Sequence, residues 1–260
     1  MTNDTGRSES PKRVKSTRTL FTILDELRGR EPAGVSELAT ALEMPKSTVH
    51  VHLKTLEEEG YLICDGDGYR LSLRFLELGG ELRHRIDAFE VARSMVDELA
   101  LETGEAAHLG IEEGGTRVLL YTSTLEDGLY DNSPAGYHTH IHWTAMGKTL
   151  LAKLSDDRVH AIVDQHGLPE ATEQTITERE RLFGELNAIR DRGYAVETDE
   201  HRNGLATISM ATEPECADCG PVGIGISGPT HRITDKDADG ELVDAIQNAI
   251  NVTELELKYY

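Results

Sequence analysis

The sequence predicts an α+β protein of two parts, a small helical unit that ends in a hairpin and a larger unit of strands and helices. The apolar residues of residues 16–75 recur at helical spacing, whereas strands alternate with helices after residue 96. Charge divides the chain in the same way. Residues 1–75 carry 11 Lys+Arg and 12 Asp+Glu, and the rest of the chain carries 15 and 35. This asymmetry is typical of two domains with different partners.

Residues 1–15 are polar and interrupted by Pro11, which predicts a flexible arm. Its basic residues include Lys12, Arg13 and Lys15, and this composition suits contact with phosphates.

Three helices are predicted between residues 16 and 60. The first ends at Gly29, the second begins at Ser36 as its N-cap, and the third opens at Pro45. Two apolar strands then flank the turn sequence DGDG at residues 65–68, a hairpin pattern. Helix, helix, short turn, helix and hairpin is the order of a winged helix-turn-helix, which we expect over residues 16–75.

The third helix is then the recognition helix, whose N-terminal residues reach base edges in the major groove of double-stranded DNA. Its inward stripe is Val49, Leu53 and Leu56, and the opposite side carries small, polar or basic residues. The candidate DNA-binding residues of the arm, the helix and the hairpin are Lys12, Arg13, Lys15, Lys46, Ser47, Thr48, His50, Val51, Lys54 and Arg70.

Residues 76–104 have a helical pattern softened by Gly79-Gly80. We expect residues 76–95 to link the two domains and to carry contacts of a dimer, because winged-helix proteins usually read two half-sites. Residues 96–260 predict a second domain, a mixed sheet with helices packed on it.

Four motifs, in this order, carry a family resemblance: MPKSTVHVHLKTLEEEGYL, HWTAMGKTLLA, RGYAVETDEHRNGLATIS and GISGPTHRI. They resemble the IclR family of transcriptional regulators over nearly the whole chain. The resemblance implies a GAF-like effector domain with a curved antiparallel sheet, and a homodimer or dimer of dimers. It also implies a small-molecule effector, often a carboxylate or aromatic metabolite. The net charge of −21, with 8 Lys against 18 Arg, suits a member from a salt-rich cytoplasm of haloarchaeal type.

The resemblance also implies where the effector binds. A pocket loop precedes a helix that starts at Gly147-Lys148, and a helix N-terminus favours an anionic ligand. Several positions depart from the common residues of the family, which leaves the class of ligand open. Carried over one by one, the effector-binding residues are Thr144, Ala145 and Met146 of the loop, Glu197 for a usual aspartate, Thr207 for a frequent cysteine, and Gly225 and Ser227 for two serines.

Two histidine and cysteine patterns support an alternative, a metal- or redox-responsive regulator. His138, His140 and His142 would project from one face of a strand, and Cys216 and Cys219 have a spacing used by zinc and redox sites. A zinc site needs further ligands, and the second cysteine pair is absent. We therefore expect no bound metal, a hairpin tip at the cysteines, and a structural His142 that braces the pocket loop.

Other classes are disfavoured. The sequence has no GxSxG elbow, no phosphate-binding glycine loop and no HExxH, so we expect neither an enzyme nor a cofactor. No apolar run approaches the ~20 residues of a membrane helix, and the N-terminus lacks the apolar core of a secretory signal. Three cysteines, an odd number, fit a reducing compartment. These features predict a cytoplasmic protein without a membrane partner.

Overall fold

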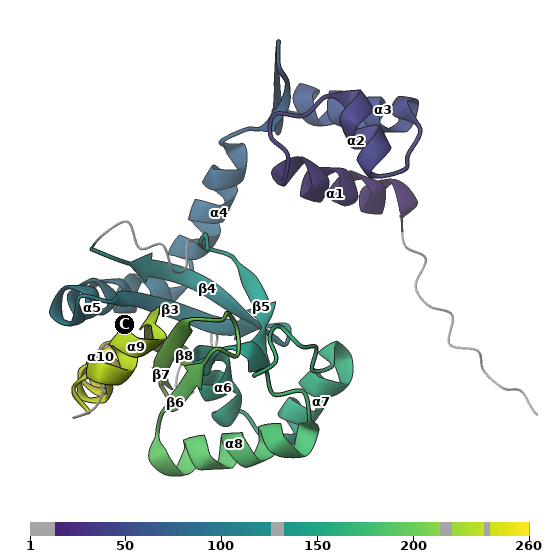
Figure 1. The fold of residues 1–260 in the computed structure, drawn as a ribbon. Coiled ribbons are helices and arrows are strands. Elements are labelled where there is room, and N and C mark those ends of the chain that lie inside the picture. Colours follow the sequence, from purple (N-terminus) through teal and green to yellow (C-terminus); the bar gives the residue numbers. More distant parts are fainter. Residues whose placement is uncertain (1–13, 126–132, 214–219, 237–239, 260) are drawn as a thin grey trace, which may run out of the picture. The chain divides into compact units, whose positions relative to one another are not determined.

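A computed structural model describes residues 14–125, 133–213, 220–236 and 240–259 (Figure 1). The chain divides into two compact units, Met1–Glu81, called unit 1, and Leu82–Tyr260, called unit 2. Each unit encloses a hydrophobic core of its own. Within the described residues, no helix is long and apolar enough to cross a membrane.

Unit 1 has the predicted winged helix-turn-helix order. The apolar faces of its first three helices meet in one core, which the hairpin closes with Leu62 and Tyr69. Val49, Leu53 and Leu56 form the buried stripe of the third helix, as expected. The elements are α1 (Lys15–Arg28), α2 (Val35–Ala41), α3 (Lys46–Glu58), β1 (Leu62–Asp65), β2 (Gly68–Leu71) and most of α4 (Arg74–His84).

The start of α2 differs from the prediction. Gly34 is the N-cap, in an extended conformation, and its backbone N–H donates to the Glu37 carboxylate at 2.8 Å. A glutamate three residues after the cap satisfies a backbone donor that the helix itself leaves unpaired. Ser36 therefore lies inside α2 rather than at its cap.

The helical stretch after the hairpin is two helices rather than one. α4 ends at His84, and α5 (Asp87–Thr103) begins after Ile86, whose backbone is extended. Gly79 and Gly80 remain within α4. The break lies at Ile86 because its side chain packs against the core of unit 2 and the acidic Asp87 suits the first turn of a new helix.

Unit 2 is built on a six-stranded sheet with the order β5-β4-β3-β8-β7-β6. Every pair of neighbouring strands is antiparallel, so the mixed sheet expected from strand and helix alternation is wrong, whereas the curved antiparallel sheet is confirmed. The strands are β3 (Ala106–Glu113), β4 (Thr116–Ser123), β5 (His138–His140), β6 (Ala195–Thr198), β7 (Leu205–Ala211) and β8 (Val222–Pro229).

Helices cover both faces of this sheet (Figure 1). On one face, α5 and α10 (Glu241–Leu257) pack against Leu109, Ile208 and Ile224 and bury the larger apolar core. On the other face lies α6 (Ala145–Ala152), with α8 (Arg179–Arg192) and α7 (Asp156–His166) outside it. A short 3-10 turn, η1 (Ile141–Trp143), precedes α6, and α9 (Thr230–Lys236) follows β8.

Glycines let α6 approach its neighbours closely. A Cβ on Gly147 would lie 1.7 Å from the carbonyl oxygen of Ile141, so only glycine fits there. Met146 occupies the space that side chains on Gly110 and Gly223 would take on the sheet. The first turn of α6 is therefore held against the sheet.

Candidate functional site

The outward side of α3 is available for contact with DNA. Lys46, Ser47 and His50 are exposed, Thr48 is half-buried, and the apolar Val51 is 62% exposed. Val51 lies opposite the buried stripe, and its side chain suits contact with a thymine methyl group. The structure thus brings the helix candidates to one side of unit 1.

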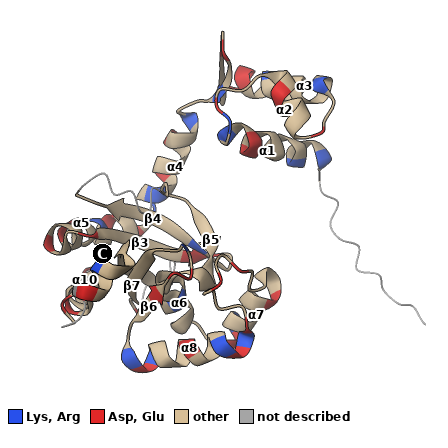
Figure 2. Ribbon diagram, viewed as in Figure 1, with Lys and Arg blue, Asp and Glu red and all other residues tan. Residues whose placement is uncertain are grey.

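Two of the candidate cations already have acidic partners. Lys54 donates to Glu57 at 3.1 Å, and Arg70 of the hairpin lies 3.4 Å from Asp65. The hydrogen bond to Glu57 raises the pKa of the exposed Lys54. Lys15 is exposed at the start of α1. Figure 2 shows basic and acidic residues interspersed over unit 1. Lys12 and Arg13 lie outside the described residues.

In unit 2, three predicted effector residues form one polar row across the sheet. Glu197 of β6 is paired with Thr207 of β7, which is paired in turn with Ser227 of β8. All three are buried. Alternate residues of a strand share a face, and their neighbours Ile208 and Ile226 point into the core under α5 and α10. The polar row therefore lies on the face that α6 covers.

His108 of β3 extends this row and was not predicted. Its Nε2 lies 2.6 Å from Ser227 Oγ, and its Nδ1 lies 3.0 Å from Thr122 Oγ1 of β4. A lone histidine within the apolar strand sequence AAHLGI was the available signal. Gly225 of β8, a predicted effector residue, is paired with His108 of β3 and with Ser209 of β7. A Cβ on Gly225 would lie 2.8 Å from the Ile208 carbonyl oxygen, so the close packing of this residue against β7 requires glycine.

Glu197 is the most perturbed acid of the site. Its side chain is 1% exposed, and Oε1 accepts a hydrogen bond from the His201 backbone N–H at 3.0 Å. Burial raises its pKa from 4.5 to about 7, against the opposing effects of that hydrogen bond and of the Lys148 ammonium. Oε2 is buried with no donor within hydrogen-bond distance, although the adjacent Thr207 hydroxyl also lowers the pKa of Glu197. Near neutral pH this carboxyl can therefore either donate or accept a hydrogen bond.

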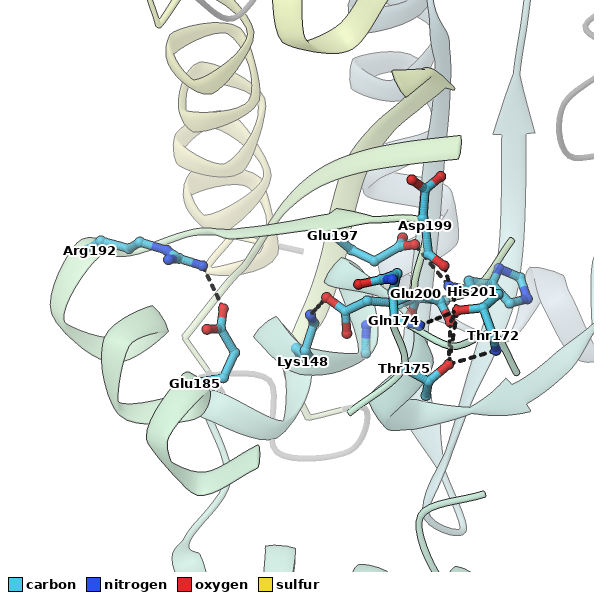
Figure 3. Close-up of polar contacts among 12 residues, drawn as sticks. Lys148, Thr172, Gln174, Thr175, Glu185, Arg192, Glu197, Asp199, Glu200 and His201 are labelled. Atoms are coloured by element: carbon cyan, nitrogen blue, oxygen red, sulfur yellow. Dashed lines mark hydrogen bonds and ion pairs between the residues drawn. The ribbon is translucent and has the colours of Figure 1, made fainter. Parts of the chain in front are cut away.

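A buried ion pair adjoins Glu197 (Figure 3). Lys148 of α6, only 1% exposed, donates to Glu200 Oε1 at 2.6 Å. Burial raises the pKa of Glu200, and Lys148 opposes that shift. The hydroxyls of Thr172 and Thr175 both donate to the Glu200 backbone carbonyl, at 3.2 and 2.6 Å. Sequence reasoning missed this pair, although a lysine inside the apolar stretch AMGKTLLA was a signal for it.

The helix that follows the pocket loop, α6, begins earlier in the sequence than predicted. Thr144 is the N-cap of α6 and accepts from Gly147 N at 3.0 Å, so the helix starts at Ala145 rather than at Gly147-Lys148. Ala145 and Met146 therefore belong to the first helical turn, and both are buried. The Thr144 side chain, three residues before Gly147, caps the helix and explains the earlier start.

The three histidines before this helix do not share a strand face. β5 ends at His140, and His142 lies in η1, because the chain turns there toward α6. His142 Nε2 lies 3.0 Å from the Pro169 carbonyl oxygen, and burial lowers its pKa to about 4, so it is a neutral structural residue. His138 is exposed beside Thr116. Among the described residues no group of three or more His, Cys, Asp or Glu side chains could hold a metal ion. Cys216 and Cys219 lie outside them.

Two family models match the chain. The IclR helix-turn-helix domain matches residues 18–65, and the C-terminal domain of the bacterial transcriptional regulator IclR matches residues 81–252. Among curated proteins, the HTH-type transcriptional regulator KdgR of Escherichia coli is 32% identical over 88% of this chain and 87% of its own. A probable HTH-type transcriptional regulator, ArcR, of Halobacterium salinarum is 26% identical over 99% of both chains.

Solved structures share the fold over most of their length. The IclR protein of Thermotoga maritima superposes with a TM-score of 0.76 at 25% identity, over 93% of this chain and 98% of that one. An IclR homologue of Microbacterium hydrocarbonoxydans, solved in complex with 4-hydroxybenzoate, has a TM-score of 0.77 at 18% identity, over 94% and 100%.

Proposed function

Because the chain belongs to the IclR family of transcriptional regulators, we propose that the polar face of its sheet is the effector site and that the outward side of α3 reads the operator. One observation carries the first part: the buried row Glu197, Thr207 and Ser227, extended by His108, lies under α6 on a sheet whose other face is apolar. Buried polar groups are retained where they have partners or a function, and the buried Glu197 oxygen has no partner within the described structure.

The DNA contacts divide into two kinds. Lys46, Ser47, Thr48, His50, Val51 and Lys54 of α3 face the bases and the groove walls, and Lys12, Arg13, Lys15 and Arg70 neutralise phosphates. Contact with bases gives sequence specificity, whereas contact with phosphates gives affinity that falls with salt.

The effector is a small carboxylate or aromatic metabolite, held by the polar row and by Thr144, Ala145 and Met146 at the start of α6. The hydroxyls of Thr207 and Ser227 suit a ligand oxygen, and the N-terminus of α6 favours an anion. The structural neighbour in complex with 4-hydroxybenzoate carries a ligand of this class. Effector binding biases one of two dimer geometries and so changes the affinity for DNA.

The regulator acts as a homodimer or a dimer of dimers in the cytoplasm, and it has no catalytic activity. Leucines exposed along α4 and just before it support the oligomer, because a two-fold contact between copies of this helix would cover them. These leucines are Leu73, Leu76, Leu78 and Leu82, with exposed fractions of 78, 69, 44 and 63%.

DNA binding tests the proposal directly. Fluorescence anisotropy would be measured with duplexes from upstream of the gene, at several salt concentrations. Thr48→Ala should weaken binding unevenly across operator variants, because it removes a contact near the bases. Lys15→Ala should weaken binding to all of them and reduce the salt slope by about 1. Lys153→Ala, in unit 2, is the matched control and should change nothing.

Failure would be clear in the same titrations. A wild-type chain that binds upstream duplexes no more tightly than scrambled ones would refute the operator assignment. If Thr48→Ala and Lys15→Ala had the same effect on every duplex, the division between base and phosphate contacts would be wrong.

A further inference from the structure

Two carboxylate oxygens beside the polar row are buried and unsatisfied. Glu197 Oε2 and Glu200 Oε2 have no hydrogen-bond partner within the described structure. The second oxygen of each group is already engaged, Glu197 Oε1 by the His201 backbone and Glu200 Oε1 by Lys148. A buried acceptor without a donor costs free energy, so this place suits a ligand that supplies donors.

The two acids belong to one small site. Glu200 follows Glu197 by three residues in the turn after β6, and the charges of Lys148 and of Glu200 both act on Glu197. Figure 3 shows Glu197, Glu200 and His201 gathered together, with Lys148 reaching Glu200 from α6. Glu200 is 13% exposed and Glu197 is 1% exposed. Both carboxyl groups therefore lie at the β6 end of the polar row.

Glu200 is held in place. Asp199 adopts a left-handed backbone conformation with φ of 62°, and its side chain accepts from the Gly204 N–H within the same turn. Thr172 donates to the Asp199 carbonyl at 2.6 Å, and Thr175 donates to the Glu200 carbonyl at 2.6 Å. This fixed backbone and the ion pair with Lys148 preorganise the carboxylate, as a ligand-binding group requires.

The charge balance favours a neutral donor over a cation. Lys148 already compensates Glu200, and burial holds the pKa of Glu197 near neutrality. From α8, Glu185 and Arg181 act on Glu200 with opposite signs. A cationic ligand would require an ionised Glu197 in this buried place, whereas hydroxyl groups would pair with either form of the acid.

We propose that Glu200 is a second ligand-binding carboxylate and that, with Glu197, it selects an effector with neutral hydroxyl donors at this end. The proposal rests on the effector site described above. Lys148 is a positioning residue: it binds Glu200 Oε1 and leaves Oε2 to accept a hydrogen bond from the ligand. Since the N-terminus of α6 favours the acid end of the effector, the ligand class is a hydroxylated carboxylic acid.

Paired probes on the full-length chain test this selection. Isothermal titration calorimetry would compare D-gluconate with hexanoate, and 4-hydroxybenzoate with benzoate. Within each pair the carbon frame and the carboxylate are matched and only the hydroxyls differ. We expect at least one hydroxylated probe to bind about tenfold more tightly than its partner. Glu200→Gln, which keeps an acceptor for Lys148 but replaces the charged acceptor of the ligand hydroxyl with a neutral amide, should weaken that preference while the affinity for the unhydroxylated partner stays unchanged.

The controls separate selection from damage. Glu185→Gln removes a nearby acid that is paired with Arg192 on α8, so it should leave the preference intact. The double variant Lys148→Met/Glu200→Gln removes both buried charges and should also lose the preference. A structural defect would weaken all probes equally and lower the melting temperature without ligand.

Several outcomes would overturn the inference. These are equal binding of hydroxylated and unhydroxylated probes, binding of neither hydroxylated acid, or a preference that is the same in Glu200→Gln as in the wild type. A tighter complex with 6-aminohexanoate that weakens as the pH falls below 7 would point to a cationic ligand instead. Loss of operator binding by the wild-type chain would refute the proposed function separately, since these titrations contain no DNA.

Discussion

The buried carboxyl of Glu197 makes the stability of unit 2 depend on pH. Its pKa is raised by burial from 4.5 to about 7, so the folded chain keeps a proton that the unfolded chain releases. The folded state is therefore most favoured below the unfolded pKa, and this contribution is lost as the pH rises through the folded pKa. At 1.36 kcal/mol for each pKa unit, the loss above neutral pH is about 3 kcal/mol.

Glu197→Gln isolates this effect, because glutamine is uncharged at every pH and resembles the protonated acid. The variant should be about 3 kcal/mol more stable than the wild type at pH 8 and nearly equal to it at pH 4.5. Urea unfolding followed by the fluorescence of Trp143 measures the difference, since this is the one tryptophan of the chain and lies in unit 2. The midpoint at pH 8 should rise by about 1 M urea.

The matched control is Glu185→Gln. Glu185 lies on α8 in an ion pair with Arg192, and its carboxylate is more exposed than that of Glu197. Its effect on stability should be small and nearly the same at both pH values. If Glu197→Gln changed stability by the same amount at pH 4.5 and pH 8, Glu197 would not titrate as a buried acid and the electrostatic reasoning would be refuted.

Three further predictions concern packing, hydrogen bonding and metal content. Gly147→Ala should unfold unit 2 or lower its melting temperature sharply, because the new Cβ would meet the Ile141 carbonyl; an unchanged circular dichroism melt would contradict this. Ser227→Ala should lower the free energy of unfolding by about 1–2 kcal/mol, because it removes a buried hydrogen-bond partner of His108. A urea unfolding curve identical to that of the wild type would contradict this. Elemental analysis of dialysed protein should find no stoichiometric transition metal, whereas one zinc per chain would revive the metal-responsive alternative.

Unit 1 could be predicted from the sequence because its signals are local. The spacing of Val49, Leu53 and Leu56 places the inward face of α3, and DGDG between apolar strands places the hairpin. The boundary at Ile86 could not be found in this way, since two glycines inside α4 gave the stronger local signal for a break. There the packing of Ile86 on the core of unit 2 decides the outcome.

The site in unit 2 was predicted only in part, because residues far apart in the sequence assemble it. Ser227 meets His108 across the β3–β8 pair, and Lys148 meets Glu200 between a helix and a turn. No periodicity links these positions. Glu197 entered through a family motif. His201 and Glu200, which act on its charge state, lie in the same motif and Lys148 lies in another, but the motifs alone do not show that these groups meet.

The Lys148–Glu200 pair is better explained by function than by stability. Moving two charges out of water carries a desolvation cost that can exceed their attraction, and well-packed apolar residues often serve as well. Lys148 lies in a helix whose other residues are apolar or small, and leucine or methionine would suit those surroundings. Apolar residues at these two positions could not, however, place a carboxylate at the site. The ion pair does so and leaves Glu200 Oε2 without a hydrogen-bond partner in the described structure. A buried ion pair at this position is therefore explained by a role of Glu200 in ligand binding. Titration with the hydroxylated probes tests which class of ligand it binds.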